Sequence, residues 1–233
     1  MYNMAMKILI TSGGTTEKID TVRSITNHAT GALGKIIAEK YLREGHQVTL
    51  VTTKNAVKPE SATNLSIFEI EDVDSLIKTL KPLVKEHDIL IHSMAVSDYT
   101  PVYMADFEKV KSSDDLDTFL RKDNHEGKIS SESEYQVLFL KKTPKVISLV
   151  KKWNPQITLV GFKLLVNVTK ENLFKVARHS LIKNKATFIL ANDLIDITSK
   201  HHIAYLLDHD NVYKATTKED IAQLIYEKVK KYD

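Results

Sequence analysis

The sequence predicts an α/β protein: a three-layer Rossmann-like fold with a mostly parallel sheet and helices on both faces. Short β-branched runs of strand length alternate with longer amphipathic runs of helix length, as in a parallel sheet with crossover helices. The first apolar run, Lys7–Thr11, ends in a glycine pair, and a second glycine pair opens an amphipathic helix. The 233 residues suffice for one sizeable core, so we expect residues 1–233 to form a single domain.

Each element of the first half has a pattern of its own. The predicted strands are rich in Ile, Leu, Val and Thr, and they are Lys7–Thr11, Gln47–Thr53, Leu65–Ile70 and Asp88–Ser93. The predicted helices have helical apolar spacing, and they are Gly31–Glu44, which ends before Gly45, and Val73–Lys85, which contains Pro82 near its end.

A polar stretch between Met94 and Ser133 interrupts this alternation. We expect residues 100–134 to form a flap after the carboxyl end of a strand, where open α/β sheets bind ligands; a disordered insertion is the alternative. The strands predicted beyond it are Tyr135–Leu140, Thr158–Val166, Thr187–Leu190, His202–Leu207 and Asn211–Ala215. The helices predicted beyond it are Lys145–Lys152, Lys170–Lys183 and Ile221–Tyr232, the last capped by Thr217 and Asp220.

The composition excludes several classes of function. A net charge of +3 with scattered basic residues gives no reason to expect nucleic acid as a partner. The absence of cysteine excludes disulfides, Cys-ligated zinc, iron–sulfur clusters and a thiol nucleophile. The chain shows neither a signal peptide nor an apolar run of membrane-spanning length, so we expect a cytoplasmic protein with no membrane partner.

The loop after the first strand has the features of a nucleotide site. Gly13, Gly14 and Thr15 would let backbone N–H groups approach a phosphate without obstruction by a Cβ atom. Gly31 and Gly34 stand at the start of the following helix, whose N-terminus favours negative charge. These five residues are therefore predicted to contact a nucleotide.

The two familiar nucleotide motifs do not fit this loop. A nicotinamide site requires its glycines in one tight turn, whereas sixteen residues separate the two glycine pairs here. The second strand ends in Val51–Lys54, without the acidic residue that holds a ribose hydroxyl. No Walker sequence occurs either.

The residues from Gly13 to Gly34 instead follow the pattern G-G-T-x-E-x-I-D-x-V-R-x-I-x-N-H-x-x-G-x-x-G. Further segments that fit the same comparison, in order, are Ala95–Tyr99, Lys128–Ser131, Thr143–Pro144, Val160–Phe162 and Ala191–Asp193. Together they span nearly the full chain, which resembles the phosphopantothenate–cysteine ligase family of coenzyme A biosynthesis in its stand-alone form.

This resemblance implies a two-step ligase. The carboxylate of 4′-phosphopantothenate attacks the α-phosphate of a nucleoside triphosphate and releases pyrophosphate, and the amine of cysteine then displaces the nucleoside monophosphate. It implies CTP, favoured over ATP, as co-substrate, Mg²⁺ bound with the nucleotide, and no flavin. It also implies a homodimer, because the family forms its pantothenate site near a subunit interface.

Three residues are carried over as catalytic. Asn27 matches the family's essential asparagine, whose amide can hydrogen-bond the acyl carbonyl of the intermediate; a turn or cap residue is the alternative. Lys128 matches the flap lysine that stabilises charge at the transferring phosphate, with Lys109 as the rival lysine. Arg23 suits a carboxylate or phosphate, although a surface ion pair with Asp20 is the plain alternative.

The remaining expected contacts are with the nucleotide. They comprise the five loop residues above together with Ser97, Asp98, Phe162, Asn192 and Asp193. Asp98 could meet the ribose or the metal, Phe162 could pack against the nucleotide, and Asn192 and Asp193 could contact the base or ribose. Core packing and helix capping are the alternatives for these side chains. No protein-bound metal site is expected, because the sequence has no His-Glu-x-x-His pattern and the adjacent His201 and His202 would point to opposite faces of a strand.

Two other functions stay open at this point. A nicotinamide-dependent reductase is disfavoured by the missing acidic ribose contact. A non-catalytic nucleotide-binding module of the same fold is kept open by departures from the family pattern: Ala29 and Thr30 stand where relatives often have serines, and Ser130 and Ser131 replace lysines.

Overall fold

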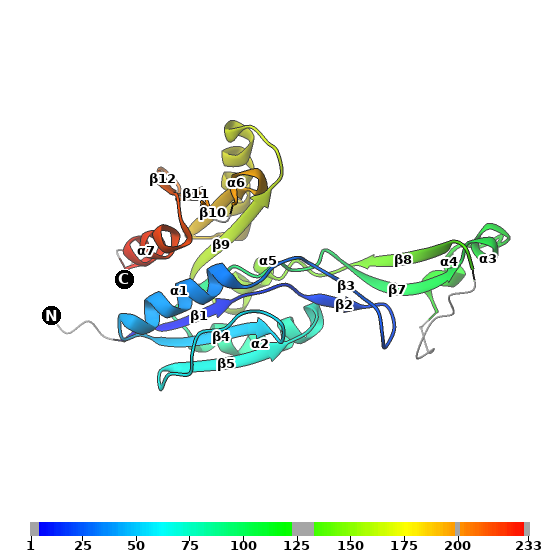
Figure 1. Cartoon of the computed structure of the whole chain (residues 1–233), viewed down its shortest axis with the longest axis horizontal. Coiled ribbons are helices and arrows are strands. Elements are labelled where there is room, and N and C mark those ends of the chain that lie inside the picture. The colour runs from blue at the N-terminus through cyan, green and yellow to red at the C-terminus, as the bar shows by residue number, and fades with distance from the viewer. Residues whose placement is uncertain (1–4, 123–132, 199–200, 231–233) are drawn as a thin grey trace.

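The computed structural model describes residues 5–122, 133–198 and 201–230. Its centre is an eight-stranded sheet (Figure 1). The strands across this sheet are, in order, β12 (Val212–Ala215), β11 (Ala204–Leu207), β10 (Phe188–Asp193), β9 (Thr158–Leu165), β6 (Ile89–His92), β1 (Lys7–Thr11), β4 (Gln47–Thr53) and β5 (Leu65–Ile70). The pairings from β10 to β5 are all parallel, and only the two edge pairings made by β11 are antiparallel.

Helices cover both faces of this sheet (Figure 1). One face packs against α1 (Ala32–Arg43) and α7 (Lys218–Val229), and the other against α2 (Val73–Glu86), α5 (Ile147–Trp153) and α6 (Lys170–Asn184). Side chains alternate along a strand, so Ile8 and Ile10 lie in the first core while Leu9 lies in the second. The predicted three-layer Rossmann-like fold is confirmed. No helix among the described residues is long and apolar enough to cross a membrane.

Local chemistry explains where these helices begin. Asp72 caps α2 by accepting from the Ser75 backbone N–H at 2.8 Å, and the Ser75 hydroxyl reciprocates at the Asp72 N–H. Thr217 and Asp220 form the same reciprocal cap at α7, as the sequence predicts. Pro82 is accommodated inside α2 at the cost of one backbone hydrogen bond.

A long antiparallel arm leaves the body of the molecule (Figure 1). It consists of β7 (Tyr99–Asp106) and β8 (Gln136–Lys142), with α3 (Phe107–Lys111) and α4 (Asp117–Leu120) at its far end. Phe119 of α4 is 2% exposed and stacks on Phe139 of β8, with ring centroids 5.2 Å apart, so the arm has a small core of its own. The predicted flap, residues 100–134, begins within β7 and ends just before β8, and residues 123–132 lie outside the described part of the chain.

The strand predicted at Tyr135–Leu140 exists as β8, but it lies in this arm and not in the central sheet. Its hydrogen-bond partner is β7, in a register that runs from Tyr99 opposite Lys142 to Asp106 opposite Gln136. Local β propensity identifies a strand but not its partner, and here the strand that precedes β8 in the chain pairs with it.

A short hairpin that the sequence does not predict interrupts the loop after β1. It pairs β2 (Thr16–Lys18) with β3 (Ser24–Thr26), and the hydroxyls of Thr16 and Thr26 lie 2.9 Å apart. The hairpin returns the chain to the end of β1, so that residue 27 lies beside Gly14.

The core contains a histidine whose ionisation opposes folding. His92 ends β6, is 7% exposed, and has its Nδ1 atom 2.7 Å from the Thr11 hydroxyl. Burial lowers the pKa of His92 to about 4, from 6.5 in an exposed histidine. Between pH 6.5 and pH 4, His92 is therefore protonated in the unfolded chain but neutral in the folded chain. We expect the free energy of unfolding to fall by about 3 kcal/mol between pH 7 and pH 4 through this group.

Urea titrations of the wild type and of His92→Gln at several pH values measure this effect. The glutamine can still bond Thr11 but does not titrate, so the variant should lose the His92 part of the pH dependence. Equal slopes of stability against pH in the two proteins would show that His92 does not titrate between the folded and unfolded states.

Candidate functional site

The candidate site lies at the carboxyl ends of β1 and β6, where the chain continues parallel pairing beyond both strands. Gly14 and Ala95 form an isolated parallel bridge. The Thr15 N–H donates to the Ala95 carbonyl at 3.0 Å, and the Ala95 N–H donates to the Gly13 carbonyl at 2.9 Å. Two motifs far apart in sequence are thus held side by side.

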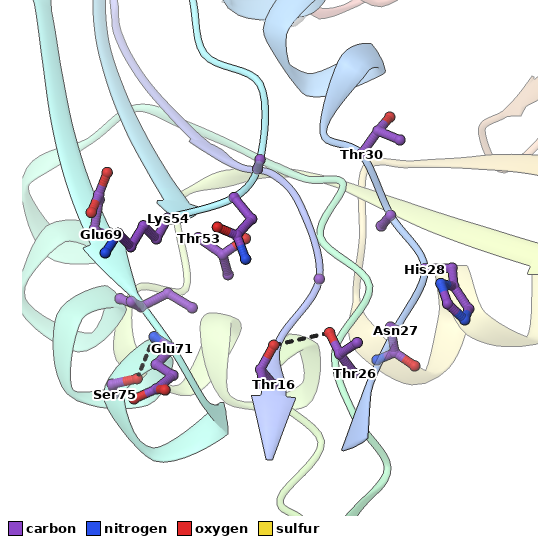
Figure 2. A pocket seen from close by; sticks show the side chains of 15 residues that line it. Thr16, Thr26, Asn27, His28, Thr30, Thr53, Lys54, Glu69, Glu71 and Ser75 are labelled. Carbon is purple, nitrogen blue, oxygen red and sulfur yellow. Dashed lines mark hydrogen bonds between the residues drawn. The ribbon is translucent and has the colours of Figure 1, made fainter. Parts of the chain in front are cut away.

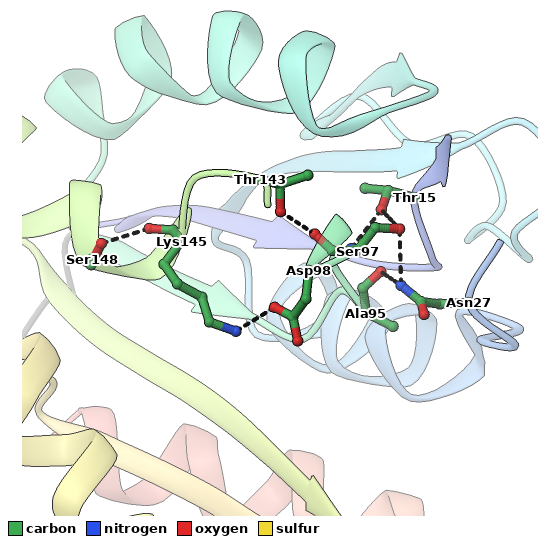
Figure 3. A network of polar contacts seen from close by, with 8 residues as sticks. All are labelled: Thr15, Asn27, Ala95, Ser97, Asp98, Thr143, Lys145 and Ser148. Atoms are coloured by element: carbon green, nitrogen blue, oxygen red, sulfur yellow. Dashed lines mark hydrogen bonds and ion pairs between the residues drawn. The ribbon is translucent and has the colours of Figure 1, made fainter. Parts of the chain in front are cut away.

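A buried hydroxyl pair fixes this junction (Figure 3). Thr15 and Ser97 are 0% and 7% exposed. The Thr15 Oγ1 donates to Ser97 Oγ at 3.0 Å and accepts from the Ser97 N–H at 2.9 Å. The Thr143 hydroxyl donates to the Ser97 carbonyl, which ties the start of α5 into the same network. Thr15 and Ser97, both predicted to contact a nucleotide, here hold the protein's own loops.

Asn27 is attached to this network from the hairpin side (Figure 3). Its Nδ2 donates to the Ala95 carbonyl at 3.2 Å and to Ser97 Oγ at 3.3 Å. These bonds are long and consequently weak, whereas its Oδ1 atom has no hydrogen-bond partner among the described residues. Asn27 is partly exposed, so its amide can exchange these contacts for a ligand.

A pocket of about 850 Å³ opens beside Asn27 (Figure 2). Its walls come from the loop after the hairpin, the ends of β4 and β5, and the first turn of α2. Its charged or titratable members are His28, Lys54, Glu69 and Glu71, and its hydroxyl members are Thr16, Thr26, Thr30, Thr53 and Ser75. This volume is within the range of small-molecule sites.

The four glycines of the loop are explained largely by packing. Gly13 has φ +85°, and a Cβ atom there would lie 2.8 Å from the Ala56 Cβ. A Cβ atom at Gly34 would lie 2.3 Å from Ser12 Oγ, so Gly34 lets α1 approach the end of β1. Gly14 lines the pocket, and Gly31, also at positive φ, is the residue immediately before α1. Phosphate contact by these backbones stays a prediction.

A cation that the sequence analysis missed lies next to Asp98. The Lys145 ammonium is ion-paired with the Asp98 carboxylate, and both side chains are more than half exposed (Figure 3). The signal was available, since Lys145 directly follows the matched pair Thr143–Pro144. Asp98 therefore lies at the rim of the network and is open to a ligand.

Arg23 lies apart from the pocket, in the turn of the hairpin. Its Nη2 and Nε donate to Asp20 Oδ2 at 2.7 and 3.0 Å, and the Asp20 side chain is fully buried. Asp20 Oδ1 also accepts the backbone N–H groups of Val22 and Arg23. The structure favours the ion pair over a direct catalytic contact for Arg23, whose catalytic role stays untested.

The last two predicted contacts, Asn192 and Asp193, also have partners within the protein. Asn192 is buried, with its Nδ2 3.1 Å from His202 Nε2. Asp193 accepts the N–H groups of Asn167 and Val168 at 2.8 Å each, and these backbone bonds lower the pKa of Asp193. Capping and core packing therefore account for both side chains. Their contact with a nucleotide is not tested.

Phe162 lies partly buried on the α1 side of the sheet and packs against that core. The neighbouring Gly161 is needed because a Cβ atom there would meet Ile147 and Ile189 at 2.7 and 2.8 Å. Phe162 and Asn192 lie on β9 and β10, whereas the pocket adjoins β4 and β5. The predicted nucleotide contacts thus span the carboxyl edge of the sheet without converging in one pocket.

Of the two candidate lysines, only Lys109 lies in the described part of the chain. It belongs to α3 at the far end of the arm, away from Asn27 (Figure 1). Lys128 lies outside the described residues. Among the residues that are described, no cluster of three His, Asp or Glu side chains could hold a metal ion.

The fold and the site define an α/β protein of Rossmann-like topology with an open pocket at the carboxyl edge of its sheet. Comparison with known families then identifies it: the model of the DNA/pantothenate metabolism flavoprotein C-terminal domain matches residues 4–124 and 118–232. The chain belongs to this family.

Relatives with assigned roles are similar over almost the whole chain. The coenzyme A biosynthesis bifunctional protein CoaBC of Methanocaldococcus jannaschii is 32% identical over 97% of this chain and 50% of its own length. That of Thermococcus kodakarensis is 31% identical over 97% of this chain and 51% of its own length. The chain therefore spans about half the length of these relatives.

Solved structures share the fold. The DNA/pantothenate metabolism flavoprotein from Streptococcus pneumoniae is 57% identical, with a TM-score of 0.94 over 98% of this chain and all of that one. A structure of a CoaBC C-terminal domain has a TM-score of 0.72 at 24% identity, over 96% of this chain and 93% of that one. The latter likeness concerns the fold alone.

Proposed function

We propose that this chain is a phosphopantothenate–cysteine ligase. The observation that carries the proposal is the position of Asn27, which matches the family's essential asparagine and lies between an open pocket and the network of Thr15 and Ser97. The CoaBC relatives are named for coenzyme A biosynthesis. A structure of Cab2, with a TM-score of 0.73 and 17% identity, was solved with phosphopantothenate-cysteine, so a protein of this fold accommodates such a molecule.

In the first step the triphosphate would bind at the loop between β1 and α1. The pocket supplies the Gly14 backbone and the Lys54 ammonium, and α1 begins near its rim at Ala32, two residues after Thr30. The helix N-terminus and the lysine both favour an anion there. Lys128 would then stabilise the charge that develops as the phosphopantothenate carboxylate attacks the α-phosphate and pyrophosphate leaves.

In the second step Asn27 would hold the acyl-nucleotide. Its Nδ2 gives up the long bond to Ser97 and donates to the acyl carbonyl, which polarises that carbonyl toward the cysteine amine. Ser97 retains Thr15 as its partner during this exchange. The amine then attacks the acyl carbon, the bond to the nucleoside monophosphate breaks, and the amide forms.

The nucleotide would arrive with Mg²⁺, which supplies positive charge to the phosphates. Exposed carboxylates at the site are compatible with it, because Asp98, Glu69 and Glu71 offer the oxygen ligands that Mg²⁺ prefers. We propose CTP over ATP from the family resemblance alone, and no flavin.

The test is pyrophosphate release by purified protein with 4′-phosphopantothenate, Mg²⁺ and either CTP or ATP, with and without cysteine. We expect release that requires phosphopantothenate and is faster with CTP, and nucleoside monophosphate that requires cysteine as well. Folded protein that binds a nucleotide but releases no pyrophosphate would replace the ligase by a non-catalytic module. NADPH oxidation or tight NADPH binding would favour the reductase.

We also propose that the chain forms a homodimer through its arm. The arm extends away from the body and exposes Tyr99, Phe107, Leu120, Tyr135 and Leu140 (Figure 1). Apolar side chains gathered on a projecting element are typical of an interface. Light scattering should give twice the mass of one chain, and a monomer at micromolar concentration would contradict this.

A further inference from the structure

Glu17 is a buried acid of the matched pattern to which the proposed chemistry gives no role. It stands in β2, is 4% exposed, and its Oε1 accepts the backbone N–H of Val73 at 3.0 Å. The Thr100 side chain in β7 also interacts with this carboxylate, and the interaction lowers the pKa of Glu17. One carboxylate thereby joins three elements: the hairpin, the first residue of α2 and the base of the arm.

These contacts are unusual for a carboxylate on a three-residue strand. Burial raises the pKa of Glu17, with further contributions from Asp72 and Asp74, while the bonds from Thr100 and Val73 oppose the rise. An apolar residue would fill the same space without the free-energy cost of burying a carboxylate. The cost of burying the carboxylate is offset by its interactions with Val73 in α2 and Thr100 in β7. Because these partners belong to two different elements, they fix the position of β2 relative to both.

Two of these elements carry the groups that the proposed reaction needs. The hairpin holds Asn27 through the pairing of Thr16 with Thr26 and the bond from the Asn27 N–H to the Thr15 carbonyl. The arm begins at Tyr99 and includes Lys109 on α3, and in the sequence Lys128 lies between the two strands of the arm, outside the described residues. A shift between hairpin and arm therefore changes the separation of the asparagine from the flap.

We propose that Glu17 is a positioning residue that locks the Asn27 hairpin to the base of the arm and so aligns the two halves of the active site. This rests on the proposed ligase function for its catalytic consequence, but not for its structural one. Displacement of a positioned group by about 1 Å costs on the order of 100-fold in rate.

The first test compares Glu17→Leu, Glu17→Gln and Thr100→Val. Leucine fills the site but accepts neither bond, and we expect kcat for pyrophosphate release to fall about 10- to 100-fold with the KM for nucleotide changed less. Glutamine keeps an acceptor for Val73 and a partner for Thr100, so its kcat should lie within about threefold of the wild type. Thr100→Val breaks only the tie to the arm and should fall between them.

The matched control is Ser24→Ala on the paired strand β3, whose side chain is exposed and lies outside the pocket. Its kcat should be unchanged. Thermal unfolding of every variant separates loss of position from loss of fold. A folded Glu17→Leu with wild-type kcat, or a Glu17→Gln as slow as the leucine variant, would overturn the catalytic consequence.

Hydrogen exchange tests the lock without reference to activity. In Glu17→Leu, amides of residues 16–27 and of 99–106 should both exchange faster than in the wild type, and Thr100→Val should affect the second set more. Faster exchange confined to α2 would show that Glu17 only caps that helix, and it would overturn the proposal. An inactive wild type would refute the ligase function, while these exchange rates would still decide the lock.

Discussion

Replacing Lys128 by glutamine is expected to abolish measurable pyrophosphate release, a fall of at least about 100-fold in kcat. The first step places a carboxylate against a triphosphate, and loss of the cation at the transferring phosphate removes charge stabilisation that operates only in the transition state. Glutamine is polar and only one atom shorter than lysine but carries no charge, so the loss would report mainly the charge. Nucleotide affinity, measured by calorimetry, should change much less than kcat.

Lys109→Gln is the matched variant, because it removes one positive charge from the same flap. Its lysine lies on α3 at the far end of the arm (Figure 1), and we expect kcat within about twofold of the wild type. The reverse outcome, in which Lys109→Gln abolishes release and Lys128→Gln is active, would transfer the role to Lys109. In a dimer such a lysine could serve the partner's site, which mixed dimers of the two variants would reveal.

Replacing Asn27 by aspartate should slow the second step more than the first, so that acyl-nucleotide accumulates. The aspartate loses the Nδ2 donor that now bonds the Ala95 carbonyl and Ser97 Oγ. It can therefore neither donate to the acyl carbonyl nor keep the Ala95 contact, and we expect a fall of about 100-fold in amide formation. Quenched reactions analysed for acyl-nucleotide, with pyrophosphate release followed in parallel, separate the two steps.

Asn172→Asp provides the control for the added charge, since Asn172 lies exposed in the first turn of α6, where an acid is favourable. It should leave both steps unchanged. Equal slowing of both steps in Asn27→Asp, with unchanged substrate affinities, would refute a role specific to the intermediate. It would instead leave Asn27 as a loop anchor.

The order of strands and helices could be predicted because it depends on short-range pattern. Lys7–Thr11 and Gln47–Thr53 are strands with the predicted bounds, since each is an apolar β-branched run closed by polar residues. The cap at Thr217 was predictable for the same reason, because both partners lie within four residues. The β2–β3 hairpin was not, because three-residue strands with the sequences Thr-Glu-Lys and Ser-Ile-Thr have no distinctive pattern.

The candidate site was predicted only in part. Asn27, Gly14 and Thr30 line one pocket, as a shared motif suggests. Asn192, however, bonds His202, and Arg23 bonds Asp20. Their contacts in this structure are therefore those of a packed core residue and of an ion pair, the alternatives to ligand binding. Polar side chains near a strand end have the same sequence signature whether they meet a ligand or a neighbouring loop, and only their partners distinguish the two.

The sequence by itself determined the fold class and the family, because both depend on periodicity and on motifs read in order along the chain. The tertiary structure decided which strands pair: β8 joins the arm, while Ala95 and Ser97 meet Asn27 across 68 and 70 residues of chain. It also showed that Glu17 joins the hairpin, α2 and the arm. Such contacts form between residues distant in sequence, so their partners are set by the packing of the whole sheet and leave no local pattern.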